Sequence, residues 1–420
     1  MKFKSLFFAF VALAGLAFIS CNDDKDDDQK FSTATVEENK LAIQDEGLAM
    51  LGEAKTIQSC PSVIYTSNAM SLIMNYYLLE NNPNFAPEKN VNLVSNLVQP
   101  IALAANLKSS DVVGFAKANP LTSILSYIED WDKLVGTYTW NFENYEWDYT
   151  AGGNEICIKF PSTFIPKGKS EDYPANDAII RIYGLKTITG TYSWTEATTL
   201  PTALNCELKI YDNTYLDFAF SAAYKTEDSR PSSLNVSLEM QNYRLAVEAS
   251  NTDSRGSASF KFKKGSQTLM AMEMNASGDW SEEALAEDDA FGSIISSGNA
   301  SIQIMNIKVA GNVDVDNINA AMELYPEDVT DSTTIAAHCD IINKYAKLSV
   351  CFVDNNRIIA KVIAYPSSYE NWNNETQQYD IEFRIGFAFK FADDSVIDAR
   401  TYFSDGFDTF MYQLRYFFRN

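Results

Sequence analysis

Six aromatic side chains fall close together in one short stretch of the chain. The stretch reads GTYTWNFENYEWDYT from residue 136, with aromatic residues at 138, 140, 142, 145, 147 and 149. Tyrosine and tryptophan rings can stack on the apolar C–H faces of sugars while their O–H and N–H groups form hydrogen bonds. The candidate ligand-binding residues are therefore Tyr138, Trp140, Tyr145, Trp147 and Tyr149, with a glycan as the first class of ligand.

The aromatic positions change from even to odd within the stretch, which indicates a hairpin. A turn at Glu143-Asn144 would place Trp140 opposite Trp147 and Tyr138 opposite Tyr149, with all six rings on one face. Glu-Asn is a poorer two-residue turn than Asn-Gly, so a longer loop is the alternative. An apolar strand face usually packs against a core. A glycan platform and a wall of an apolar cavity for lipid-like ligands are the two functional alternatives.

A cysteine near the N-terminus carries a different chemistry. Lys2 and Lys4 precede an apolar stretch over 6–20 that ends in FIS before Cys21. This stretch is shorter than the roughly 20 residues of a membrane span, and it has the anatomy of a signal peptide. The sequence resembles the lipobox of bacterial lipoproteins, in which the cysteine is acylated and becomes the first residue. An ordinary cleaved signal with an incidental cysteine is the alternative.

The acidic run after Cys21 resembles the export signal of surface lipoproteins in Bacteroidetes-type bacteria. It reads NDDKDDDQK, and the whole resemblance covers only residues 1–28. It implies a protein of the outer membrane that is held by its lipid and faces the cell exterior. The periplasmic face is the alternative location.

The charge balance argues against two classes of partner. The chain has 33 basic and 56 acidic residues and a net charge of −23. Loss of a signal that holds two lysines and no acid brings the net charge to −25. Nucleic-acid phosphates and anionic lipid surfaces would be repelled. We expect no nucleic-acid partner and membrane attachment through the lipid alone, and nothing indicates a protein partner.

Catalytic and metal-binding motifs are absent from the sequence. His338 is the single histidine, which excludes every site that needs two, and we expect it to be an ordinary helix residue. The chain has no GxSxG, P-loop or GxGxxG pattern, so we expect no cofactor and no metal. We favour a binding or structural role over catalysis. A carboxylate-dependent glycoside hydrolase is the enzyme alternative, and no acidic pair stands out for it.

The remaining cysteines are typical of small core residues. They are odd in number and contain no CxxC: Cys60, Cys157, Cys206, Cys339 and Cys351. Alternation along their strands should place Cys157 and Cys206 on opposite faces of a sheet. We therefore predict that these two thiols do not form a disulfide.

The hydrophobic periodicity predicts an α+β fold: an N-terminal helical bundle followed by a large antiparallel β-sheet portion with a docked C-terminal helix. The regions are a signal peptide over 1–20, a lipidated acidic tether over 21–35, a helical region over 36–133, an antiparallel β region over 134–280, and a mixed α+β region over 281–420. A capping box at Thr35 and Glu38 begins the first helix. Alternating aromatic and aliphatic residues over 379–391 predict a long strand whose face receives the C-terminal helix.

Three finer expectations concern strand and helix boundaries. The motif GTY-x-W occurs at 136 and nearly unchanged at 190, and we expect each copy to open a strand. The segment 301–311 reads as one strand. Asp316 should cap a helix, a reading preferred here to a calcium loop beginning at Asp314, and a second helix should follow near 330–345.

Overall fold

The computed structural model describes residues 30–75, 78, 83, 131–163, 175–190, 198–225, 231–281, 294–325, 331–373, 377–404 and 407. The expected signal peptide, Cys21 and the acidic run lie outside these residues. So do most of 76–130, the acidic stretch over 282–290 and the expected C-terminal helix beyond Phe407. Among the described helices, none has the length and apolar composition needed to cross a membrane.

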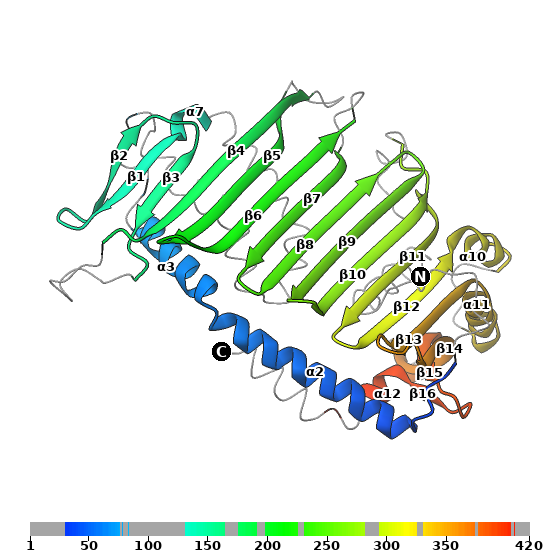
Figure 1. Ribbon diagram of the computed structural model, residues 1–420. Coiled ribbons are helices and arrows are strands. Elements are labelled where there is room, and N and C mark those ends of the chain that lie inside the picture. The colour runs from blue at the N-terminus through cyan, green and yellow to red at the C-terminus, as the bar shows by residue number, and fades with distance from the viewer. Residues whose placement is uncertain are drawn as a thin grey trace. The chain divides into compact units, whose positions relative to one another are not determined.

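Sixteen strands form one hydrogen-bonded sheet, in the order β16-β15-β14-β13-β12-β11-β10-β9-β8-β7-β6-β5-β4-β3-β1-β2 (Figure 1). The sheet is mostly antiparallel, as the sequence predicts. The β1–β3 pair is parallel, which corrects the expectation of an antiparallel region throughout. The expectation assumed that a parallel pair needs a crossover helix. Here strand β2 makes the return, and β3 follows it in the direction of β1 and pairs with β1's other edge.

The chain divides into two compact units. Unit 2 comprises Gly52–Glu248 and Lys263–Gly265, and unit 1 comprises Met1–Leu51, Ala249–Phe262 and Ser266–Asn420. The elements of unit 2 are the end of α2 (Val36–Gln58), α3 (Pro61–Asn75), α7 (Trp131–Leu134), β1 (Gly136–Asn141), β2 (Glu146–Ala151), β3 (Ile156–Phe160), β4 (Ala178–Gly190), β5 (Thr198–Ile210), β6 (Asn213–Tyr224), β7 (Pro231–Met240) and most of β8 (Tyr243–Asn251).

In unit 2 the described helices are tied to the sheet. Ser62 of α3 donates a hydrogen bond to the carbonyl of Tyr215 in β6. Glu53 of α2 accepts from Lys264 at 2.8 Å and from Tyr243 at 3.2 Å. Helices α2 and α3 fulfil the helical prediction for their own residues. The rest of the expected bundle falls outside the described residues and stays a prediction.

Unit 1 contains the remaining elements. They are the first part of α2, the end of β8, β9 (Arg255–Lys264), β10 (Gln267–Gly278), β11 (Ile295–Ile304), β12 (Ile307–Asp314), α10 (Val315–Met322), α11 (Ser332–Tyr345), β13 (Ala346–Phe352), β14 (Ile358–Asn373), β15 (Gln378–Lys390), β16 (Val396–Asp398) and α12 (Ala399–Ser404). Strand β15 confirms the long alternating strand that the sequence predicts.

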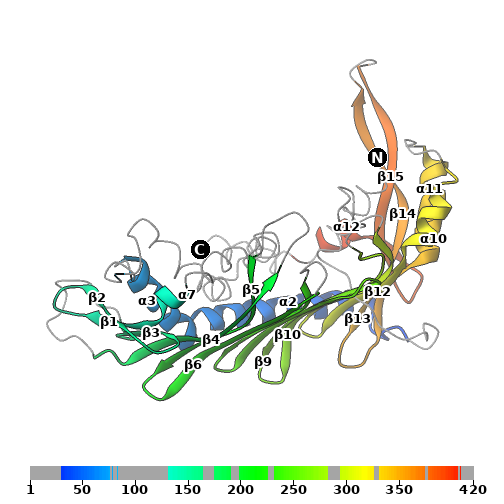
Figure 2. The same cartoon turned by 90° about the horizontal axis from the view of Figure 1, so that it is seen from above.

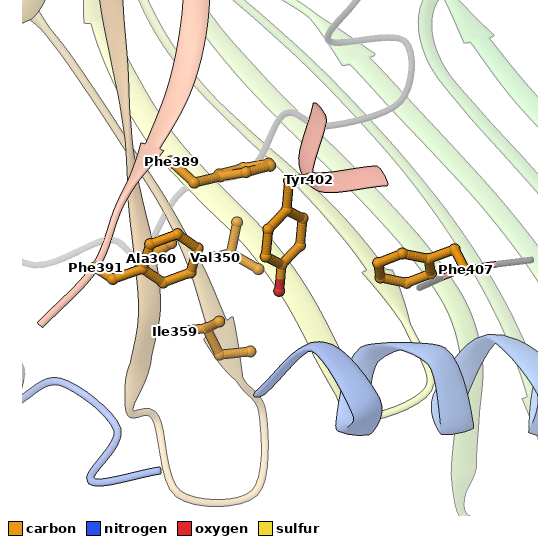
Figure 3. Close-up of a cluster of buried hydrophobic side chains, with 7 residues drawn as sticks. All are labelled: Val350, Ile359, Ala360, Phe389, Phe391, Tyr402 and Phe407. Atoms are coloured by element: carbon orange, nitrogen blue, oxygen red, sulfur yellow. The ribbon is translucent and has the colours of Figure 1, made fainter. Parts of the chain in front are cut away.

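The apolar face of β15 is covered along most of its length. Phe383, Ile385 and Phe387 pack against the cluster formed with α10 and α11, which lie beside β14 and β15 (Figure 2). Phe389 packs with Tyr402 of α12 and with Phe407 in a second cluster (Figure 3). The described cover is therefore α10, α11 and α12. Phe407 is the one described residue of the expected C-terminal helix.

The fold begins a few residues before α2. Phe31 forms a parallel bridge with Ile358, so part of the segment expected to be tether already belongs to unit 1. The predicted capping box is present at the start of α2. The backbone N–H of Thr35 donates to Glu38 at 2.7 Å, and the N–H of Glu38 donates to the Thr35 hydroxyl at 3.2 Å.

The structure corrects two of the finer boundaries, and a third falls mostly outside the described residues. The segment 301–311 is two strands, because the chain turns at Met305 with a positive φ of 52°. Gly190 of the second GTY-x-W copy is the last residue of β4, and the rest of the copy lies outside the described residues, so the expectation that it opens a strand stays a prediction. The cap of α10 is Asp314 rather than Asp316, and its side chain accepts from the N–H of Asn317. The second helix, α11, is where the sequence predicts it.

Candidate functional site

Two of the three predicted aromatic pairs are present between β1 and β2, whereas Phe142 and Tyr145, expected to oppose each other as the third pair, lie in the loop outside both strands. Trp140 lies opposite Trp147 with ring centroids 5.4 Å apart, and Tyr138 lies opposite Tyr149 with centroids 5.0 Å apart. The turn is longer than two residues, because Asn141 pairs with Glu146 across a four-residue loop. The longer loop leaves the register unchanged. We call the five candidate residues the aromatic ladder: Tyr138, Trp140, Tyr145, Trp147 and Tyr149.

The centre of the aromatic ladder is enclosed. The exposed fractions of Tyr138, Trp140 and Trp147 are 0%, 3% and 1%. Tyr145 and Tyr149 are half-buried. The hydroxyl of Tyr138 donates to the carbonyl of Leu134 at 2.9 Å, and the hydroxyl of Tyr149 donates to a backbone carbonyl as well. Rings that are covered and whose hydroxyls already serve the backbone favour the packing role over a ligand platform.

An open groove of about 990 Å³ lies in unit 1, across one end of the neighbouring strands β8 to β13. Its lining is dominated by hydroxyl, amide and charged side chains: Ser250, Thr252, Arg255, Ser257, Glu273, Asn275, Ser277, Ser297, Asn299, Ser301, Asn312, Asp314, Lys344, Tyr345 and Lys347. Strand alternation explains why these residues share a face, since Glu273, Asn275 and Ser277 are two residues apart along β10. We call this site the polar groove.

A row of amides crosses the polar groove. Asn275 of β10 lies opposite Asn299 of β11, which lies opposite Asn312 of β12, which lies opposite Lys347 of β13. The side-chain amide of Asn275 donates to the side-chain oxygen of Asn299 at 3.0 Å. We call the three asparagines the amide row. Neighbouring strands are about 4.8 Å apart, so the amide row repeats donors and acceptors at that interval.

Serine hydroxyls extend the same surface on both sides of the amide row. Ser277 lies opposite Ser297, and the hydroxyls of Ser250 and Ser257 are 2.6 Å apart. A hydroxyl donates one hydrogen bond and accepts two, and an asparagine side chain donates two and accepts two. The polar groove therefore offers both kinds of hydrogen-bonding group over its floor.

Both carboxylates of the polar groove are engaged by other groups. Glu273 pairs with Lys261 at 2.7 Å, and the hydrogen bond from Lys261 lowers the pKa of Glu273 below its ordinary value. Asp314 caps α10 and accepts from the backbone N–H of Asn317 at 3.1 Å. The capping position also places the Asp314 charge at the positive end of the helix.

The three cations of the polar groove have no carboxylate within ion-pair distance among the described residues: Arg255, Lys344 and Lys347. Lys347 donates to the carbonyl of Asn343 at 2.6 Å, and Lys344 lies 4.7 Å from the ring centroid of Tyr345. Asn343 also bonds both backbone groups of Ala364, which fixes the end of α11. Helix α11 thereby positions Lys344 and Tyr345 at the margin of the groove.

The two carboxylates do not have the geometry of a glycosidase pair. Glu273 lies opposite Ser301, which lies opposite Ala310, four residues before Asp314. Strand spacing and rise put their backbones roughly 16 Å apart. Glycosidases hold their carboxyl groups about 5–9.5 Å apart and raise the pKa of the acid. The pKa of Glu273 is lowered instead, which is opposite to the shift that a general acid needs.

The cysteines and the histidine show no grouping for metal or redox chemistry. No cluster of three or more metal-ligating side chains occurs in the part of the chain that the structure describes. The five described cysteines are buried, and none of them forms a disulfide with another described residue. Cys157 lies opposite Arg181 and Cys206 opposite Ile182, so the two sulfurs are on opposite faces, as predicted. His338 lies in α11 with its ring against Tyr325, and burial lowers its pKa.

The polar groove was missed by the sequence reasoning, although a signal for it exists. Ser297, Asn299 and Ser301 alternate along β11, as Asn275 and Ser277 do along β10. When 301–311 is taken as one strand, the residues before 301 are not assigned to β11. The pairing of the polar faces of β10 and β11 is then not seen. A search for small polar residues at alternate positions of consecutive strands would have found this face.

No family model matches the chain, and comparisons with curated proteins and with solved structures gave no match. The residues of the polar groove and the aromatic ladder therefore carry the functional argument. Of the two surfaces, the polar groove is the one whose side chains are open to a ligand.

Proposed function

We propose that the protein is a surface-exposed lipoprotein of the outer membrane that binds a polyhydroxylated ligand, namely a glycan, in the polar groove. The observation that carries the proposal is the amide row, flanked by serines, in an open groove of about 990 Å³. The lipid anchor and the location rest on the resemblance of residues 1–28.

The chemistry of the lining favours a sugar over an apolar ligand. Each sugar hydroxyl both donates and accepts a hydrogen bond, and serine and asparagine side chains do the same. Tyr345 adds an aromatic ring at the margin, which can stack on the C–H face of a sugar. A lipid-like ligand would require a predominantly apolar cavity.

The open shape of the groove also suits a chain-like ligand. The groove runs across strands β8 to β13, so a ligand lying along the amide row would meet a new side chain at each strand. Glycan binding through the aromatic ladder has less support, because Tyr138, Trp140 and Trp147 are buried.

A glycan array tests the ligand class. The chain from Asn22 onward would be compared with the variant Asn275→Ala/Asn299→Ala and with a matched control, Asn213→Ala/Asn235→Ala, which removes two exposed amides outside the groove. We expect the original chain and the control to bind the same glycans and the groove variant to lose them. Binding that survives in the groove variant, or no binding by any form, would overturn the proposal.

Membrane fractionation tests the anchor separately. Cys21→Ala should move the protein from the membrane to the soluble fraction, because the acyl chains have no other attachment point. Replacing the aspartates of 23–28 with asparagine should keep the anchor and remove the protein from the cell surface. A Cys21→Ala variant that still needs detergent for extraction would refute the lipoprotein assignment.

A further inference from the structure

We infer that the ligand of the polar groove is an anionic saccharide, one that carries carboxylate or sulfate groups. The inference rests on the proposed function and names the class of glycan. It follows from the charges of the lining and not from the amide row, which would suit a neutral sugar equally well.

The cations of the polar groove are available to a ligand. Arg255, Lys344 and Lys347 are exposed and have no carboxylate partner among the described residues. The chain as a whole has 33 basic and 56 acidic residues, so a groove lined by three cations and two carboxylates differs in charge balance from the rest of the sequence. The lining gathers three cations and leaves none of them neutralised.

The acids of the polar groove do not cancel these cations. The charge of Glu273 is paired with Lys261 at 2.7 Å, and the charge of Asp314 is partly offset by the N-terminus of α10. A ligand in the groove therefore meets a surface that is locally positive.

The cations are placed at both ends of the amide row. Lys347 is in register with Asn312 at one end, and Arg255 lies on β9, next to the strand of Asn275 at the other end. Four strand spacings separate β9 from β13, or about 19 Å. A saccharide with charged groups along its length can contact both ends while its hydroxyls bond the amides between them.

The strongly negative net charge does not prevent such binding. Charges more than a Debye length apart are screened, and that length is about 8 Å at physiological ionic strength. Repulsion between an anionic ligand and the acids elsewhere on the surface is therefore weaker than the attraction between the ligand and the cations of the groove.

A titration with three probes of matched length tests the inference. The probes are an oligogalacturonate, which carries carboxylates, a chondroitin sulfate oligosaccharide, which carries sulfates, and a neutral dextran oligosaccharide. We expect the chain from Asn22 onward to bind at least one anionic probe about tenfold more tightly than the neutral one, with an affinity that falls as salt rises. Three exposed ion pairs of modest strength account for a factor of that size.

Two charge variants separate local contacts from net charge. Arg255→Gln/Lys344→Gln/Lys347→Gln removes the groove cations. Its control, Lys55→Gln/Lys159→Gln/Lys186→Gln, removes the same charge from exposed positions elsewhere in the described chain. We expect the first variant to lose about tenfold in affinity for the anionic probe and the control to bind within about twofold of the original chain.

Each other outcome overturns the inference in a distinguishable way. Binding of the neutral probe alone, abolished by Asn275→Ala/Asn299→Ala, would refute the anionic class and leave the proposed function standing. Equal losses in the two charge variants would assign the effect to net charge and refute the groove contacts. No binding of any probe, together with an empty glycan array, would refute the inference and the proposed function.

Discussion

In the aromatic ladder, Trp140 lies opposite Trp147 on neighbouring strands, and in the amide row Asn275 lies opposite Asn299 in the same way. The central rings of the ladder are buried, with 1% of Trp147 exposed, whereas the amide row faces an open groove. Antiparallel register can therefore align like side chains in either environment. What decides their role is whether another part of the chain covers the row.

The two regions also differ in how their polar atoms are used. The hydroxyls of Tyr138 and Tyr149 donate to backbone carbonyls at 2.9 Å and 2.8 Å, so they serve the fold. Within the part of the chain that the structure describes, the amide row makes one side-chain hydrogen bond, from Asn275 to Asn299. An asparagine has four hydrogen-bonding sites, so most of the row's capacity is directed to solvent or to a ligand.

Truncation of the ladder should give the largest effect. Trp147→Ala should lower the free energy of unfolding by roughly 3–5 kcal/mol, because it empties a buried site. Urea denaturation followed by circular dichroism measures this. Trp372→Ala, at a tryptophan that is 47% exposed, is the matched control and should change stability by less than about 1 kcal/mol. Equal effects at the two positions would contradict the assigned burial of the ladder.

The rate of thiol alkylation should differ between a buried position of the sheet and a position in the polar groove. Burial raises the pKa of Cys206 to about 12, so almost no thiolate forms near pH 8 and the folded protein should not be labelled there. A thiol introduced in the groove by Asn299→Cys should react at least about a hundredfold faster. Mass spectrometry of a timed alkylation compares the two sites. Rapid labelling of Cys206 under native conditions would contradict the packing of β5.

The pH dependence of Glu273 should give a smaller effect. The hydrogen bond from Lys261 lowers the folded-state pKa of Glu273 from 4.5. The pair therefore stabilises the fold above the unfolded-state pKa, and this contribution is lost as pH falls through the folded-state pKa. Glu273→Gln should lower the free energy of unfolding by less than about 1 kcal/mol at pH 7, because the pair is partly exposed, and by progressively less as the pH falls below 4.5. A loss of stability that stays constant as the pH falls through the acid range would contradict the assigned pair.

Truncation of the amide row should have the smallest effect on the stability of the fold. Asn275→Ala/Asn299→Ala should change the free energy of unfolding by less than about 1 kcal/mol, because both side chains border an open groove. Urea denaturation of the variant and of Asn213→Ala/Asn235→Ala measures it. A loss of 3 kcal/mol or more, on the scale of Trp147→Ala, would mean that the row is structural and would remove the contrast with the ladder.

The sequence predicted those parts of the fold that depend on strict local periodicity. Strand β15 and the opposed rings of the ladder follow from alternation, and the Thr35–Glu38 cap follows from a four-residue pattern. The parallel β1–β3 pair did not follow, because neighbours in a sheet are chosen by long-range contacts. The polar groove did not follow either, since its lining comes from seven elements between Ser250 and Lys347, each with little signal of its own.

The central claim is that the ligand binds in the polar groove and not at the aromatic ladder. Calorimetric titration tests it most directly, using the tightest glycan from the array and two variants of the chain from Asn22 onward. One variant is Asn275→Ala/Asn299→Ala, and the other is Tyr145→Ala, which truncates a half-exposed ring of the ladder. The account predicts at least a tenfold weaker Kd for the groove variant and an unchanged Kd for Tyr145→Ala. An unchanged Kd in the groove variant, with binding lost in Tyr145→Ala, would contradict it.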